Sequence, residues 1–339
     1  FLDNKSGKEI VAISESKDFI YSDVYNLGSI TKKHKSMDFH INSVLDLDLV
    51  KTKLIKKTKL KVVVDGINSS GGIIVPMLLD ELNIEYSTIY CEPNGDFQHN
   101  PEPLKKNLTV LCNKVLKEKA DLGIAVDPDV DRLVFVCENG EIFGEENTLV
   151  ACSDYVLSKN PGPTVSNLSS TRALNDVTKS YNQIYFPSAV GEVNVVSEMK
   201  SRGAVIGGEG NGGIIYPKSH YGRDAIVGIA LFLSLICERK ISLSQLLSTY
   251  PKYFMTKEKI NLSKEINVDT ILENLSKKYS KENINLIDGL KIDFKESWVH
   301  LRKSNTEAII RIYSEAKTLK ESEKLVDLIK KDIYLLTNQ

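Results

Sequence analysis

The sequence has little of what marks a secreted, membrane-spanning or nucleic-acid-binding protein. It holds only five cysteines, with no CxxC pair and no dense spacing. We therefore expect a cytoplasmic protein whose cysteines are reduced. The five cysteines are Cys91, Cys112, Cys137, Cys152 and Cys237. The longest apolar stretch, 225–237, is shorter than the roughly 20 residues that cross a bilayer, and no signal-like segment opens the chain. This stretch predicts a buried helix and no membrane partner.

The chain also lacks an excess of charge of either sign. Lys and Arg number 44 and Asp and Glu 45 within 339 residues, which leaves no strong field to hold nucleic acid. The expected partner is a small molecule. A soft prior of roughly one domain per 150 residues predicts two or three domains.

The first half carries a βαβ pattern. Apolar runs at 60–65, 85–91 and 122–126 are typical of buried strands, and helical periodicity occupies 73–82 and 104–120. Such alternation predicts an α/β domain with a parallel sheet. Functional side chains of parallel sheets gather at the carboxyl ends of the strands.

A similar pattern restarts after the Pro-Gly-Pro turn at 161–163. Strands are expected at 164–168, 183–186 and 204–207, and helices at 172–181 and 193–202. This is a second α/β domain.

The C-terminal part changes pattern. Segments 298–302 and 308–313 alternate like two paired strands, and a final helix begins at a capping box formed by Thr318 and Glu321. The predicted fold class is therefore two consecutive α/β domains followed by an α+β domain.

The sequence DPDVDR, which we call the acidic loop (127–132), directly follows a predicted strand. Asp127, Asp129 and Asp131 at every second position can converge on one hard cation, whereas in a continuing strand they would repel. The loop predicts a magnesium site. A solvated acidic turn is the plain alternative.

Two other families carry similar loops. An EF-hand also shows D-x-D-x-D, and Glu138 supplies its acidic twelfth position, but Arg132 replaces the required Gly and 133–137 is a strand pattern. We reject the EF-hand. A phosphatase of the haloacid dehalogenase type, with Asp127 as nucleophile, stays an alternative, although such loops usually continue with Gly and Thr or Val.

The sequence GGEGNGG, which we call the glycine loop (207–213), suits a polyol. Its glycines allow close backbone approach, while Glu209 and Asn211 offer hydrogen-bonding groups to sugar hydroxyls. A structural turn is an equally good interpretation of this motif alone. His220 and Arg223 follow and could reach a phosphate or sugar oxygen, although Arg223 could equally help to cap the next helix.

The sequence RKSNTEAIIR, which we call the basic loop (302–311), suits a phosphate. Arg302 and Arg311 supply forked guanidinium donors, and short donors lie between them, namely Ser304, Asn305 and Thr306. An ordinary polar hairpin is the alternative.

Together these three loops resemble the α-D-phosphohexomutase superfamily. The acidic loop is similar to its DxDxDR metal loop, Gly208 and Glu209 to its sugar loop, and 302–308 to its RxSNTEP phosphate loop. The resemblance implies four domains, divided here into a remnant of a first α/β domain and three complete ones: 1–42, 43–150, 151–252 and 253–339.

The resemblance also implies a mechanism. A phosphoserine of the first domain, just upstream of Phe1, would phosphorylate a hexose or hexosamine phosphate and recover the other phosphate from the bisphosphate, thus exchanging the 1- and 6-phosphates. Asp127, Asp129 and Asp131 would hold Mg²⁺, and Arg132 would stabilise the transferring group. The resemblance implies that this chain alone is inactive, and a non-catalytic sugar-phosphate-binding fragment is a further alternative.

Several positions depart from the superfamily pattern and indicate which members the sequence resembles. Asn211 and Gly213 stand where many members carry Ser and His, and this form is similar to archaeal-type phosphoglucosamine mutases and some bacterial phosphoglucomutase/phosphomannomutase relatives. Glu192 stands where some relatives carry His; a helix-starting glutamate is a better interpretation than a proton carrier. Ala308 replaces the usual Pro, which should loosen the turn.

Overall fold

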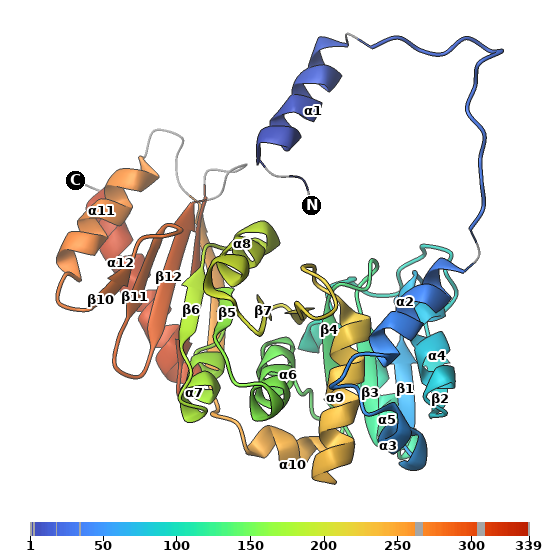
Figure 1. Cartoon of the computed structure of the whole chain (residues 1–339). Coiled ribbons are helices and arrows are strands. Elements are labelled where there is room, and N and C mark those ends of the chain that lie inside the picture. The colour runs from blue at the N-terminus through green and yellow to red at the C-terminus, as the bar shows by residue number, and fades with distance from the viewer. Residues whose placement is uncertain are drawn as a thin grey trace.

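The computed structural model describes residues 2, 4–17, 19–33, 35–261, 267–303 and 309–337. Three sheet-containing domains lie side by side, and helix α1 (Asn4–Ser16) stands apart from them on an extended segment (Figure 1). Every described residue from Lys8 to Lys33 is exposed.

The most N-terminal of these three domains, which we call the acidic-loop domain, contains a four-stranded sheet in the order β2-β1-β3-β4. Its strands are β1 (Lys61–Asp65), β2 (Glu85–Ile89), β3 (Leu122–Val126) and β4 (Leu133–Cys137). Only β4 is antiparallel to its neighbour. The central strands read as continuous apolar runs because helices such as α4 (Gly71–Glu81) and α5 (Thr109–Glu118) cover the sheet. Helices α2 (Ser36–Leu45) and α3 (Thr52–Lys57) pack against other helices of the α/β domains.

The second domain, the glycine-loop domain, repeats this arrangement. Its sheet order is β6-β5-β7-β8, again with only the last strand antiparallel. The strands are β5 (Thr164–Asn167), β6 (Tyr185–Ser188), β7 (Ile206–Glu209) and β8 (Gly213–Ile215), and the helices are α6 (Glu145–Lys159), α7 (Ala173–Ser180), α8 (Glu192–Arg202), α9 (Ala225–Arg239) and α10 (Leu243–Ser248). The predicted pair of α/β domains is confirmed.

One hydrophobic core runs through both α/β domains. Helix α9 is buried from Ala225 to Cys237, as its apolar sequence predicted, and it packs Phe232 on Phe135 of β4 with ring centroids 3.8 Å apart. Among the residues described here, no helix combines the length and apolarity needed to cross a membrane.

The C-terminal domain is α+β, as predicted. Its antiparallel sheet has the order β10-β11-β12-β13-β9, with β9 (Phe254–Asn261), β10 (Asn283–Asn285), β11 (Leu290–Asp293), β12 (Trp298–Lys303) and β13 (Ile309–Ala316) beside α11 (Val268–Lys278) and α12 (Leu319–Thr337). The predicted capping box is present, because Thr318 and Glu321 exchange side-chain and backbone hydrogen bonds. Strands β9, β10 and β11 were not predicted from the sequence.

One predicted helix begins later than its periodicity suggested. The pattern over 104–120 yields a 3₁₀ turn at Lys105–Asn107 and a helix only from Thr109. The Asn107 side chain donates to the carbonyl of Glu102, a local bond that competes with helix formation.

Polar contacts join the glycine-loop and C-terminal domains. The Arg172 guanidinium donates to the carbonyls of Phe294, Lys295 and Ser297. His300 is buried between the domains: its Nε2 donates to the Asp288 carbonyl at 2.7 Å, and its Nδ1 lies 2.9 Å from the Ser169 hydroxyl. Both bonds suit a neutral imidazole.

We expect His300 to make stability depend on pH. Burial lowers the pKa of His300 to about 4, and the charges of Lys291 and Arg302 act in the same direction. The hydrogen bond to the Asp288 carbonyl and the charge of Asp288 oppose this decrease. Because the unfolded side chain titrates near 6.5, stability present above that pH is lost as pH falls toward 4, by about 3 kcal/mol. Urea titrations at pH 7 and pH 4 should therefore show a stability loss about 3 kcal/mol smaller in His300→Gln. An equal loss in both proteins would contradict this expectation.

Candidate active site

The acidic loop and the glycine loop occupy equivalent places in the two α/β sheets. The acidic loop follows β3, and the glycine loop includes the end of β7; each of these is the third strand of its sheet and leads into an antiparallel strand, β4 or β8. The two hairpins meet where the amide of Leu133 donates to the carbonyl of Gly212 at 3.1 Å. A Cβ on Gly212, whose φ is +88°, would lie 2.3 Å from the Leu133 carbonyl oxygen, so only glycine permits this approach.

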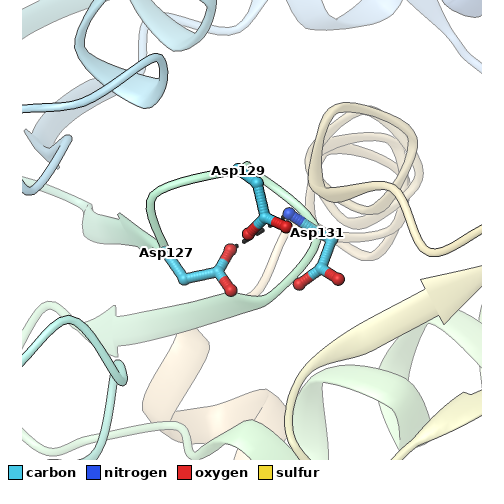
Figure 2. A group of neighbouring side chains, drawn as sticks. All are labelled: Asp127, Asp129 and Asp131. Carbon is cyan, nitrogen blue, oxygen red and sulfur yellow. Dashed lines mark hydrogen bonds between the residues drawn. The ribbon is translucent and has the colours of Figure 1, made fainter. Parts of the chain in front are cut away.

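The three aspartates of the acidic loop converge as the sequence predicted (Figure 2). One carboxylate oxygen of each lies within 4.8 Å of the others. Asp127 is buried, and its Oδ1 accepts the amides of Asp131 and Arg132, each at 3.0 Å. Asp129 is exposed and has no hydrogen-bond or ion-pair partner among the described residues. The loop therefore brings one carboxylate oxygen of each aspartate toward one point.

Neighbouring segments fix the conformation of the acidic loop. The hydroxyls of Ser69 and Ser70 both donate to the Pro128 carbonyl, at 2.8 and 2.6 Å. Val130 adopts a φ of +61°, which is unfavourable for a β-branched residue. The first amide of α9, that of Ala225, donates to the Val130 carbonyl at 3.0 Å and holds this strained residue in place.

The charges of the loop favour a bound cation. Burial raises the pKa of Asp127 to about 7, and the carboxylates of Asp131 and Asp129 act in the same direction. The hydrogen bond from the Arg132 amide opposes this rise. Asp131 Oδ1 is buried without a hydrogen-bond partner among the described residues. Three converging carboxylates, only partly balanced by the neighbouring Arg132 and Arg223, suit a hard divalent cation such as Mg²⁺, which prefers oxygen ligands. The residues present fit that ion.

Arg132 lies beside this cluster. Its Nε is 3.5 Å from Asp127 and 3.7 Å from Asp131, and its outer nitrogen is 3.4 Å from Glu102. The guanidinium is about one-third exposed, so it can also face an anionic ligand.

Arg223 connects the acidic loop to the glycine-loop domain. Its guanidinium forms ion pairs with Asp131, with Glu192 at 3.2 Å and with Glu209 at 2.7 Å. Its own amide donates to Glu192 at 2.8 Å. The sequence had suggested a ligand contact or a helix cap for Arg223. The side chain that caps α9 is that of Asp224. Arg223 instead lies at the centre of a charge cluster with Asp131, Glu192 and Glu209.

Both carboxylate oxygens of Glu209 are engaged within the protein. Oε1 accepts from the Asn167 side chain and the Gly191 amide, and Oε2 faces Arg223. Asn211 accepts the amide of Gly213. Any ligand of the Glu209 carboxylate would share or displace these partners, and the contact with Asn167 was not predicted from the sequence.

His220 lies at the edge of the cluster rather than within it. Its Nε2 is 2.9 Å from Asp224, and His40 of α2 reaches the same carboxylate oxygen at 2.9 Å. The hydrogen bond to Asp224 and the charge of that carboxylate raise the pKa of His40, against the effect of its burial. Through this shared carboxylate, His40 joins α2 to the N-terminus of α9.

The two arginines of the basic loop belong to a row of three cationic side chains, which we call the basic row: Arg302, Arg311 and Lys259. Arg302 on β12 stands directly opposite Arg311 on β13, which stands opposite Lys259 on β9, so the three side chains share one face of the sheet. This is also the face of His300, which contacts the glycine-loop domain. Arg302 pairs with Asp288 at 2.8 Å; Arg311 and Lys259 are exposed and have no acidic partner among the residues that the structure describes. Ser304, Asn305, Thr306 and Ala308 lie outside the described residues.

Three consecutive family models match the chain. Models of phosphoglucomutase/phosphomannomutase alpha/beta/alpha domain II, alpha/beta/alpha domain III and the C-terminal domain match residues 38–140, 145–253 and 259–331. A phosphoglucosamine/phosphogalactosamine mutase of Sulfurisphaera tokodaii is 31% identical, over 97% of this chain and 75% of that protein. The chain belongs to the phosphoglucomutase/phosphomannomutase family. It is thus part of the superfamily that its loops resemble.

Other relatives agree with this family. A phosphoglucomutase/phosphomannomutase of Thermococcus kodakarensis is 35% identical over 82% of the chain, which spans only 62% of that relative. A solved structure of a phosphoglucomutase/phosphomannomutase family protein from Burkholderia thailandensis matches 98% of the chain and 70% of its own, with a TM-score of 0.83 at 23% identity. The latter shows a common fold. Family membership leaves no support for the haloacid dehalogenase alternative.

Proposed function

We propose that this chain is the larger part of a magnesium-dependent phosphohexomutase that exchanges the 1- and 6-phosphates of a hexose or hexosamine. Within that class, the proposal favours a phosphoglucosamine mutase or a phosphoglucomutase/phosphomannomutase. The proposal rests chiefly on one observation: Arg223 joins the acidic loop to the glycine loop through Asp131 and Glu209. Residues of two domains thereby form one site.

The basic row adjoins the same site. Asp288 pairs with Arg302 and also accepts the amide of Val190, directly before the segment that leads to Glu192. A phosphosugar bound between the glycine loop and the basic row would therefore lie near the acidic loop. This supports assigning the non-reacting phosphate to Arg302 and Arg311.

In this proposal, Asp127, Asp129 and Asp131 hold Mg²⁺, which when bound supplies positive charge to a transferring phosphoryl group. Arg132 contributes a second positive charge at the same place. Glu209 and Asn211 orient the sugar. The phosphoryl donor and acceptor is a serine of a preceding domain, as the resemblance implies.

The decisive experiment uses the product of the full reading frame. With Mg²⁺ and a trace of sugar bisphosphate, we expect it to convert glucosamine 1-phosphate or glucose 1-phosphate into the 6-phosphate, followed by ³¹P NMR. The 339-residue chain alone should bind these sugars without turnover. Absence of conversion of any hexose or hexosamine 1-phosphate by the full-length protein would overturn the proposal.

We further expect Lys259 to strengthen phosphate binding. Lys259→Gln removes one exposed charge of the basic row, so KM for the phosphosugar should rise about three- to ten-fold with kcat nearly unchanged. The matched control is Lys303→Gln. Lys303 neighbours Arg302 in sequence, but it points to the opposite face and pairs with Asp269 at 2.9 Å. Equal effects of the two substitutions in steady-state assays would refute a role of the row.

A further inference from the structure

A cavity of about 650 Å³ opens between the glycine-loop and C-terminal domains. It lies between the two sheet edges formed by β6 and β10. None of the described residues that line it belongs to the acidic loop, the glycine loop or the basic row. The function proposed above therefore leaves this cavity without a role.

Lys291 of β11 lines the cavity although its side chain is almost wholly buried. The residue is 8% exposed. Its ammonium donates one hydrogen bond, to the Leu168 carbonyl at 2.9 Å, and lies 4.3 Å from the centroid of the Trp298 ring. It forms no ion pair with a carboxylate of the described residues, so two N–H donors are unpaired. Burying a cation without an anionic partner is costly.

The acidic groups that line the cavity form no ion pair with Lys291 and have other partners. Asp293 is paired with Arg172 at 3.3 Å, and Asp176 accepts the hydroxyl of Tyr253 at 2.6 Å. Two lysines at the rim have no acidic partner among the described residues, namely Lys179 and Lys295. Four cationic side chains therefore line the cavity against two acidic ones, a surplus that matches a dianion.

We propose that this interdomain cavity binds a phosphate-type anion, either inorganic phosphate or the phosphate group of a small metabolite, with Lys291 as its buried contact. Burial lowers the pKa of Lys291, although Asp293 and Glu315 oppose that shift, and an anion would restore the favourable environment of the charged amine. The volume exceeds that of bare phosphate and leaves room for a small organic group.

A ligand in this cavity would touch a segment that supports the glycine loop. Ser170 lines the cavity, and its hydroxyl accepts the amide of Gly210 at 2.9 Å. Thr171 also lines it, and its amide donates to Glu146, whose carboxylate packs against Gly210. The anion would thus contact the glycine loop through one intervening layer. This proposal does not depend on the mutase activity.

Calorimetry on the 339-residue chain can test the site once the basic row is disabled by Arg311→Glu. In that background we expect inorganic phosphate and glucose 6-phosphate to retain one binding site, and the tighter of the two identifies the source of the anion. Adding Lys291→Met should weaken binding at least about ten-fold. Lys317→Met is the matched control, because Lys317 also stacks on an aromatic ring, that of Tyr253 at 4.1 Å, without lining the cavity.

A second variant covers the case in which Lys291→Met does not fold. Lys179→Glu reverses an exposed charge at the rim and should weaken binding about three- to ten-fold, whereas Lys331→Glu on the exposed face of α12 should not. Absence of binding in the Arg311→Glu background would overturn the proposal. So would binding that neither cavity variant weakens. A failed mutase assay with a positive result here would reject the mutase and retain the site.

Discussion

Asp129→Asn should weaken Mg²⁺ binding by about 100-fold and lower turnover of the full-length enzyme by about 100- to 1,000-fold. The physical reason is the loss of one of three negative charges that converge within 4.8 Å. Asp129 suits this test better than Asp127, because Asp127 Oδ1 accepts two backbone amides that shape the loop. Asp129 is exposed and supports no other described residue, so the fold should persist.

The measurements are calorimetric Mg²⁺ titration, steady-state kinetics and thermal unfolding. Glu141→Gln is the matched control, because Glu141 is an exposed acid in the turn after β4 and lies outside the cluster. We expect the control to retain wild-type affinity and turnover. Unchanged affinity and turnover in Asp129→Asn would show that the acidic loop is not the metal site.

Arg223→Met should destabilise the protein by about 3–5 kcal/mol. Arg223 is 14% exposed and pairs with three carboxylates that are themselves largely buried. Removing the cation leaves Asp131, Glu192 and Glu209 close together without compensation, and breaking a buried charge cluster on one side typically has this effect. Because Asp131 and Glu209 lie in different domains, their relative placement should also change.

Urea unfolding of the 339-residue chain checks this expectation. Arg202→Met is the control: Arg202 also pairs with a glutamate, Glu198 at 2.8 Å, but on the surface, where a pair contributes about 1 kcal/mol or less. A loss for Arg223→Met no larger than that of the control would mean that the cluster does not hold the domains together. Mg²⁺ titration of the folded variant would then show whether Arg223 still positions Asp131.

Several features were predictable because they are encoded locally. Alternating apolar segments identified the two α/β domains, and the long apolar run identified the buried helix 225–237. The spacing of Asp127, Asp129 and Asp131 indicated that they would converge, because a tight loop leaves three alternate side chains few other directions. Strands β9, β10 and β11 were not predicted, because β10 and β11 are very short and the residues of β9 do not alternate regularly between buried and exposed.

The sequence by itself therefore determined the family, the order of the domains and the candidate metal ligands. Only the tertiary structure showed that Arg223 joins Asp131 to Glu209, that Lys259 continues the row of Arg302 and Arg311, and that Lys291 is a buried cation. The reason is physical. Periodicity and loop spacing report the local environment of a segment, whereas these contacts depend on sheet register and on the packing of domains far apart in the chain.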